Sequence, residues 1–462
     1  MWHSLKNLKT MKKLLLTFSL IALTSTLNAQ WTSQGTGFTA TSRGLSQVTA
    51  LDANTVWAMA YDGSGLGSNV QEFTLTTNGG SSWTAGTIDV GNTAWELNNI
   101  CPVSATTAWV SAINNITGDA NNGVGYIYKT SDSGTTWTQQ CETGFQVAGA
   151  SFLNGVYFWN ASVGVAFGDP EGTEYEIWRT TDGGDNWTRV PGANIANPLS
   201  GEYGYNNTPI AAGGTLWFPT NKGRLYKTTD QGATWTAAQA PLTDFGAALP
   251  ANSGSAIFSS ASNGYLLKTS GTVATPVYTF YTTTNGGQTW STATPFTGTR
   301  RILNYIPGTT TIVATSQAAP VGTSISANNG ATWTDLEVGG TEQRGASAFL
   351  NGSTGWCAGF GDGDPLGSAG IFKLSGSLGL DNAATVTKFR VYPNPANSVI
   401  TISSTNVDSY NLTVTDLTGK VVMTKSLNGI ENSIDLSTLS TGAYLFELRS
   451  DKGNEVIKIL KN

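Results

Sequence analysis

An eight-residue motif recurs six times between residues 76 and 333, and it constrains this chain more than any other feature. Each copy has the pattern Ser/Thr-x-Asp/Asn-x-Gly-x-polar-Trp. The residues at the third position are Asn78, Asp132, Asp182, Asp230, Asn285 and Asn328, and the closing tryptophans are Trp83, Trp137, Trp187, Trp235, Trp290 and Trp333. Successive tryptophans are 43 to 55 residues apart. A regular period of this length predicts a repeat architecture built from one supersecondary unit.

The physical chemistry of the motif predicts a hairpin. The residues before a copy alternate in character, as in residues 126–129, which is typical of a β-strand. Glycine at the fifth position permits a positive φ in a tight turn. The Asp or Asn side chain can accept hydrogen bonds from backbone N–H groups inside that turn. The tryptophan then folds back between adjacent sheets and supplies a large apolar area to the core.

The surrounding sequence predicts seven repeats, although the motif occurs six times. A seventh strand pair is found at residues 355–359 and 370–373, with no tryptophan after it. Residues 30–33, Gln-Trp-Thr-Ser, match the strand that follows a motif. We therefore predict an all-β chain with a seven-bladed β-propeller at residues 30–376. The N-terminal strand would complete the last blade and close the ring.

The motif is the Asp-box, or BNR repeat, and residues 31–376 resemble the sialidase-like propeller superfamily. Within it they look most like secreted BNR-repeat proteins related to photosystem II assembly factors, and more distantly like xyloglucanase propellers. The resemblance implies the fold but no particular activity, because function depends on sites grafted onto a fold.

The composition changes after residue 376. Residues 377–387 have the character of a linker, and residues 388–462 contain short alternating strands that predict a small Ig-like β-sandwich. The sequence has Tyr-Pro-Asn-Pro at 392–395, Asp-x-x-Gly-Lys at 416–420, Gly-x-Tyr at 442–444 and a basic tail. This ordered set resembles the type A C-terminal sorting domain of the type IX (Por) secretion system of Bacteroidetes. The resemblance implies that this machinery is a partner and exports the chain, usually removing the domain. An ordinary Ig-like domain is the alternative.

The N-terminus has the features of a signal peptide. Met11, an alternative start, is followed by two lysines, an apolar run at 14–23 and a cleavage site at 27–29. The run is too short to span a bilayer. We therefore predict that residues 1–29 are removed and that the chain has no transmembrane helix. It would cross the periplasm and be secreted or attached to the outer surface.

Removal of residues 1–29 would make the chain more acidic and leave it without histidine, which excludes several partners and mechanisms. It takes away four lysines and leaves 20 basic against 30 acidic residues, which argues against nucleic acid and anionic membranes as partners. It also removes His3, the only histidine, and with it any Ser-His-Asp mechanism or His-ligated zinc site. No metal or cofactor is implied.

We expect Cys101, Cys141 and Cys357 to be buried free thiols, with a Cys101–Cys141 disulfide as the alternative.

A candidate ligand site is expected at one mouth of the central channel. The box hairpins occupy one face, so the loops that lead into the inner strands and those that precede the box strands share the other. The ligand-binding candidates on that loop face are Arg43, Arg301, Arg344, Tyr203, Tyr205 and Trp95, with Arg300 beside them. Arginines on adjacent blades could clamp a carboxylate. Alternatively, they pair with nearby acids and order the mouth.

Two enzymatic alternatives use the same face. The sialidase resemblance implies a Tyr/Glu pair, for which Glu202 with Tyr203 or Tyr205 could serve, although Arg43 stands where an Arg-Ile-Pro motif is expected. Glycoside hydrolysis needs two carboxylates across a cleft. The carboxylates available on this face are Asp62, Asp169, Glu171, Asp362 and Asp364. Xyloglucanase-like enzymes, however, use two propellers around their cleft.

We therefore predict a non-catalytic binding or scaffolding module with a glycan or protein ligand. The alternatives are a surface glycoside hydrolase and an assembly factor for another exported complex. The box tryptophans should belong to the core. Trp95 and Trp159 are the better candidates for an exposed, sugar-binding aromatic surface.

Overall fold

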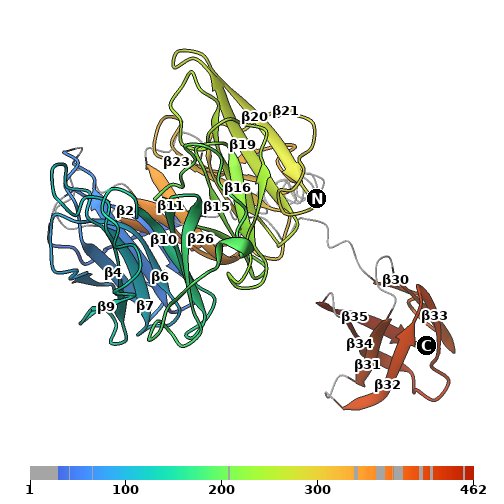
Figure 1. Ribbon diagram of the computed structural model, residues 1–462. Coiled ribbons are helices and arrows are strands. Elements are labelled where there is room, and N and C mark those ends of the chain that lie inside the picture. Colours follow the sequence, from blue (N-terminus) through green and yellow to red (C-terminus); the bar gives the residue numbers. More distant parts are fainter. Residues whose placement is uncertain are drawn as a thin grey trace, which may run out of the picture. The chain divides into compact units, whose positions relative to one another are not determined.

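The computed structural model describes residues 30–376, 378 and 389–462, apart from 41, 65, 207–208, 338–341, 360–369, 405–408, 417–419 and 451–452. The expected signal peptide, Asp362 and Asp364 lie outside these residues. The chain divides into two compact units after Leu378, coloured blue to orange and red in Figure 1. The described residues contain no α-helix, only one 3-10 turn at Gly192–Asn194. No helix within these residues is long and apolar enough to cross a membrane.

The first unit is made of seven four-stranded antiparallel sheets, so the expected seven-bladed propeller is confirmed. The strands are, blade by blade, β2 (Arg43–Ala50), β3 (Val56–Asp62), β4 (Glu72–Thr76) and β5 (Thr84–Thr87); β6 (Glu96–Pro102), β7 (Ala108–Ile113), β8 (Gly125–Thr130) and β9 (Thr138–Gln140); β10 (Leu153–Phe158), β11 (Gly164–Glu171), β12 (Glu174–Thr180) and β13 (Thr188–Arg189); β14 (Ile210–Ala212), β15 (Thr215–Pro219), β16 (Arg224–Thr228) and β17 (Thr236–Gln239); β18 (Ser253–Phe258), β19 (Gly264–Gly271), β20 (Pro276–Thr283) and β21 (Thr294–Pro295); β22 (Ile302–Tyr305), β23 (Ile312–Ser316), β24 (Gly322–Ser326) and β25 (Thr334–Asp335); and β26 (Arg344–Asn351), β27 (Thr354–Gly359), β28 (Ile371–Ser375) and β1 (Gln30–Gln34).

Blade seven is assembled from both ends of the propeller. β1 pairs antiparallel with β28, as the sequence of residues 30–33 predicts. The Trp31 indole N–H donates a hydrogen bond to Thr323 Oγ1 of blade six, at 2.9 Å. On the other side, the Trp83 indole N–H of blade one donates to Gln34 Oε1, at 3.1 Å. β1 therefore links blade seven to both of its neighbours.

The Asp-boxes are hydrogen-bonded turns between the third and fourth strand of a blade. In blade three, Thr180 Oγ1 donates to Asp182 Oδ1 at 2.8 Å and accepts a bond from the Gly184 N–H at 2.9 Å. Asp182 Oδ1 also accepts from the Asn186 N–H, at 2.9 Å. Bonds from the Asn186 side chain and backbone lower the pKa of Asp182 to about 2. The other five boxes repeat the pattern.

The threonine hydroxyl should matter more to this turn than the charge of the aspartate. We expect Thr180→Val to lower the free energy of unfolding by about 1–2 kcal/mol, because it leaves the buried N–H of Gly184 without an acceptor. Asp182→Asn should change stability little, since three other boxes carry asparagine at this position. Urea unfolding followed by tryptophan fluorescence reports on the propeller alone, because the C-terminal unit has no tryptophan. Equal destabilisation by both substitutions would contradict this account.

The deepest tryptophans do not come from the boxes. Trp57, Trp109 and Trp217, with Trp356, lie on the second strands of their blades and are fully buried. Trp83 and Trp235 are buried members of the core, and the other four box tryptophans are partly buried and pack against core clusters. A box tryptophan follows the outermost turn of its blade, where neighbouring sheets diverge. A second-strand tryptophan is covered by the next blade, as where Trp109 stacks on Phe158, with ring centroids 3.5 Å apart.

Basic side chains at the end of the third strands connect neighbouring blades. Lys373 Nζ donates to the Gly79 carbonyl oxygen of the blade-one box, at 2.6 Å. Arg179 Nε donates to the Gln231 carbonyl oxygen of the blade-four box, at 2.8 Å. The box turn therefore closes its own hairpin and also accepts a cation from the preceding blade.

All three cysteines are free thiols, as expected. Cys101 and Cys357 are buried, and Cys141 is partly buried. Burial raises the pKa of each thiol to about 12.

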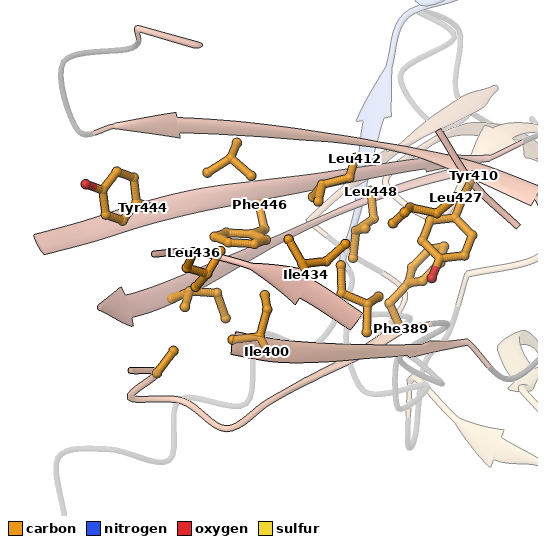
Figure 2. Close-up of a cluster of buried hydrophobic side chains, with 14 residues drawn as sticks. Phe389, Ile400, Tyr410, Leu412, Leu427, Ile434, Leu436, Tyr444, Phe446 and Leu448 are labelled. Carbon is orange, nitrogen blue, oxygen red and sulfur yellow. The ribbon is translucent and has the colours of Figure 1, made fainter. Parts of the chain in front are cut away.

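The C-terminal unit is a sandwich of two antiparallel sheets. Its strands are β29 (Phe389–Tyr392), β30 (Val399–Ser404) and β33 (Glu431–Asp435) in one sheet, and β32 (Val421–Asn428), β31 (Ser409–Asp416), β34 (Gly442–Ser450) and β35 (Gly453–Lys461) in the other. Figure 2 shows Ile400 and Ile434 of the first sheet beside Leu412, Phe446 and Leu448 of the second. Every other residue of these strands points inward, and the expected small β-sandwich is confirmed.

Candidate functional site

Asp169, one of the candidate carboxylates, links two blades at the loop face. It lies on β11, beside a register shift in the pairing of that strand with β12. Asp169 Oδ1 accepts hydrogen bonds from Asn154 Nδ2 at 2.8 Å and from the Gly204 N–H at 2.9 Å. Burial raises the pKa of Asp169 to about 6, against the lowering effect of these two bonds. The carboxyl therefore holds the loop that leads into blade four against blade three.

Replacing Asp169 should make the propeller more stable at alkaline pH. A folded pKa above the ordinary value of 3.8 means that deprotonation disfavours the native state, so stability is lost as the pH rises from about 4 through 6. Asp169→Asn keeps an acceptor oxygen and removes the charge. We expect it to raise the free energy of unfolding at pH 8 by up to about 3 kcal/mol, and to change it little at pH 4. Urea unfolding at both pH values tests this, and an equal difference at each would contradict the assignment.

The same loop reaches blade two through Asn206. Asn206 Nδ2 donates to Glu96 Oε1 at 3.1 Å, and Asn115 Nδ2 donates to Glu96 Oε2 at 3.0 Å. Trp95, the neighbouring ligand-binding candidate, stacks on Tyr126 with ring centroids 4.0 Å apart and planes 6° from parallel. One face of the Trp95 ring is therefore already covered within blade two.

Glu202 and Tyr205, one of the two Tyr/Glu pairs of the sialidase alternative, are each bonded to another side chain. The Glu202 side chain is fully buried and forms an ion pair with Arg224 Nη1 at 2.7 Å. Glu202 also accepts bonds from Thr220 Oγ1 and a backbone N–H, each at 2.7 Å. The Tyr205 hydroxyl donates to Asp244, and burial raises the pKa of Tyr205. The two side chains are thus held by different partners.

The exposed Tyr203 and the partly buried Asp62 have local contacts. The Tyr203 ring is 45% exposed and meets Tyr205 edge-on, with centroids 5.8 Å apart. Asp62 Oδ1 accepts bonds from the Ser64 hydroxyl and N–H, and Asp62 Oδ2 accepts from the Ser68 N–H at 2.9 Å. The hydroxyl bond and the backbone bonds lower the pKa of Asp62 to about 2. Asp62 therefore fixes its own loop.

Two of the candidate arginines are neutralised by acids. Arg43 makes a bidentate pair with Glu72, at 2.9 and 3.1 Å. Arg344 is 3% exposed, pairs with Glu337 and lies over the Phe372 ring, 4.3 Å from its centroid. Neither guanidinium is presented to solvent as an open anion clamp.

Arg300 and Arg301, at the start of blade six, have different surroundings. Arg300 is buried, donates to the Val321 carbonyl oxygen and pairs with Asp335 at 2.6 Å. Arg301 is exposed and lies over the Tyr278 ring, with its guanidinium carbon 3.9 Å from the centroid. Of the candidate arginines, Arg301 has the most accessible charge. Among the described residues, no three His, Cys, Asp or Glu side chains gather as a metal site would require.

A cavity of about 570 Å³ lies at the opposite, box-side end of the central channel. The inner strands of blades one to four supply its wall, together with the turns that follow them. The lining residues are Gln47, Thr49, Leu51, Asn99, Ile100, Cys101, Pro102, Val103, Tyr157, Phe158, Trp159, Asn160, Ala161, Pro209 and Ala211. Sequence reasoning placed the site at the other mouth and named only Trp159 from this set as a candidate for ligand binding. The closely spaced aromatic residues 157–159 at the end of an inner strand are the signal that could have found it.

Comparison with known proteins identifies the C-terminal unit. Residues 390–462 match the family described as the secretion system C-terminal sorting domain. No curated protein matches the sequence.

Several solved structures are similar to the chain at low identity. They include YCF48 from Cyanidioschyzon merolae, with 12% identity, a TM-score of 0.49 and coverage of 75% of this chain and 98% of that one. The GH74 xyloglucanase from Xanthomonas campestris has 15% identity, a TM-score of 0.47 and coverage of 82% and 60%. The Trypanosoma rangeli sialidase has 11% identity, a TM-score of 0.41 and coverage of 91% and 84%.

These are the classes that the Asp-box repeats resemble, although at such similarity they say nothing of this chain's ligand. The C-terminal match is the more specific finding. Residues 390–462 match the secretion system C-terminal sorting domain family, and the chain is a β-propeller protein exported by the type IX secretion system to the cell surface or beyond.

Proposed function

We propose that the propeller is an exported, non-catalytic binding module. The observation that carries this proposal is the way the candidate catalytic groups are bonded. Asp62 fixes its own loop, Glu202 is buried against Arg224, and the Tyr205 hydroxyl is bonded to Asp244. A nucleophile or general base must be free to reach its substrate. These three side chains instead form bonds that hold the loops at this end of the propeller.

Asp169 supports a glycoside hydrolase as the second candidate. A carboxyl with a pKa of about 6 has the property that a general acid needs near neutral pH. Hydrolysis also requires a second carboxylate across the substrate. The two bonds that Asp169 accepts from Asn154 and Gly204 instead suit a structural link between blades.

A combined binding and hydrolysis assay on the full exported chain tests the proposal. A panel of neutral and acidic oligosaccharides is incubated with the protein from pH 4 to pH 8, and released reducing ends are measured beside glycan-array binding. We expect retention of a ligand without product release, for both the natural chain and Asp169→Asn. Product release that disappears in Asp169→Asn would replace the proposal with the hydrolase.

A further inference from the structure

We propose that the box-side cavity of the channel binds a neutral sugar unit. This inference rests on the proposed binding function and adds its site and ligand class. It concerns the mouth opposite to the arginines and carboxylates of the loop face, and it depends on the charge, shape and hydrogen-bonding capacity of the cavity wall.

The wall of the cavity carries no charge. All of the residues that line it are neutral, in a chain with 30 acidic and 24 basic residues. A carboxylate, phosphate or ammonium group entering the cavity would lose its hydration without gaining an ion pair, which is costly. The wall therefore selects an uncharged ligand.

One side of the cavity is a fixed aromatic surface. Tyr157 and Trp159 alternate at the end of β10, and their rings meet edge-on with centroids 5.1 Å apart. The Trp159 indole N–H donates to the Gly214 carbonyl oxygen of blade four at 2.8 Å, which sets the orientation of the ring. The C–H groups of a sugar ring carry small positive charges and pack against the negative face of such rings. A surface ordered in advance lowers the entropic cost of binding.

The cavity also offers a hydroxyl group with unused bonding capacity. The Tyr157 hydroxyl has no hydrogen-bond partner within the part of the chain that the structure describes. The buried amides of the cavity wall are already engaged, because Gln47 Nε2 donates to the Ile100 carbonyl oxygen and Asn99 Nδ2 to that of Val156. An aliphatic ligand would leave the phenol unpaired, at a cost in affinity. A sugar hydroxyl would pair with it.

The size of the cavity agrees with this ligand class. Ligand cavities span about 300–1,000 Å³, and about 570 Å³ leaves room for a sugar ring and part of its chain. Neutral charge, an aromatic wall, a free hydroxyl and this volume together point to a hexose or N-acetylhexosamine unit.

Isothermal titration calorimetry on the full chain tests the inference. The probes are lactose, cellobiose, maltose and N,N′-diacetylchitobiose, each beside a counterpart in which one primary alcohol is oxidised to a carboxylate. We expect at least one neutral disaccharide to bind, and its acidic counterpart to bind at least tenfold more weakly. Binding of acidic sugars alone, or of none, overturns the inference.

Variants locate the site and separate it from the proposed function. Ala211→Trp adds bulk at an exposed wall position and should weaken binding at least tenfold without disturbing the fold. Tyr157→Phe removes only the hydroxyl and should weaken it about five- to tenfold. Tyr281→Phe, on β20 in blade five and outside the cavity wall, also removes only a hydroxyl; it is the matched control and should stay within about twofold.

The possible failures are distinguishable. Neutral-sugar binding that Ala211→Trp and Tyr157→Phe leave intact overturns this site but keeps the binding function. Hydrolysis of a bound disaccharide overturns the non-catalytic function itself. Binding of tyrosine-containing peptides in place of sugars, abolished by Ala211→Trp, would replace the ligand class with protein.

Discussion

Removal of residues 30–34 is expected to destabilise the propeller more than any single substitution. The deletion removes β1, and with it the outer strand of blade seven and the indole of Trp31. Loss of a fully buried aromatic side chain costs about 3–5 kcal/mol, of which the partly buried Trp31 gives a share. The deletion also leaves the edge of β28 unpaired along five residues. We expect a loss of about 5 kcal/mol or more in the free energy of unfolding. Thermal and urea unfolding of chains that begin at Gln30 and at Gly35 would measure it.

A matched control separates the strand from its exposed side chains. Thr32→Ala with Ser33→Ala changes two exposed positions of β1 and keeps its backbone pairing. This variant should unfold like the natural chain. If the shortened chain matched it in melting temperature and elution volume, β1 would have no part in closing the ring.

Glu202→Gln is expected to lower the free energy of unfolding by about 3–5 kcal/mol. The substitution leaves Arg224, whose side chain is 13% exposed, without the carboxylate that neutralises it. Breaking a buried pair by removing one partner is costly because the remaining charge stays desolvated. Urea unfolding of the variant, followed by tryptophan fluorescence, would give the value.

A double substitution tests whether the effect belongs to the ion pair. Glu202→Met with Arg224→Met removes both charges and should recover a substantial part of the lost stability. Additive losses would contradict the coupling. A Glu202→Gln protein with natural stability but without product release from a glycan would instead indicate a catalytic carboxylate.

The fold could be predicted because its signals are local. Each Asp-box holds the whole set of hydrogen bonds of its turn within eight residues, as Thr180 and Asp182 illustrate. The closing strand could also be recognised, because residues 30–33 repeat the pattern that follows a box. Similar reasoning explains why the C-terminal sandwich was predictable from alternation along β30 and β31.

The candidate site could not be predicted to the same depth, because its contacts cross between blades. Asn206 reaches Glu96 over 110 positions of sequence, and Glu202 finds Arg224 on a strand 22 residues later. Nothing in the pattern around residues 201–206 indicates which carboxylate is buried and which is exposed. The burial of the tryptophans could not be predicted either, since the motif contains Trp137 but not the more deeply buried Trp109.

The three free thiols could form wrong disulfides while the protein is being exported. The signal peptide that the sequence predicts would take the chain through the periplasm, where thiols are oxidised to disulfides. Only a thiolate attacks a disulfide, and with a pKa of about 12 the folded thiols are ionised at pH 7 in only about one molecule in 10⁵. Once the blades are assembled, burial of Cys101 and Cys357 and partial burial of Cys141 leave little thiolate to start mispairing. The chain is therefore most vulnerable to wrong cross-links while it remains unfolded in transit.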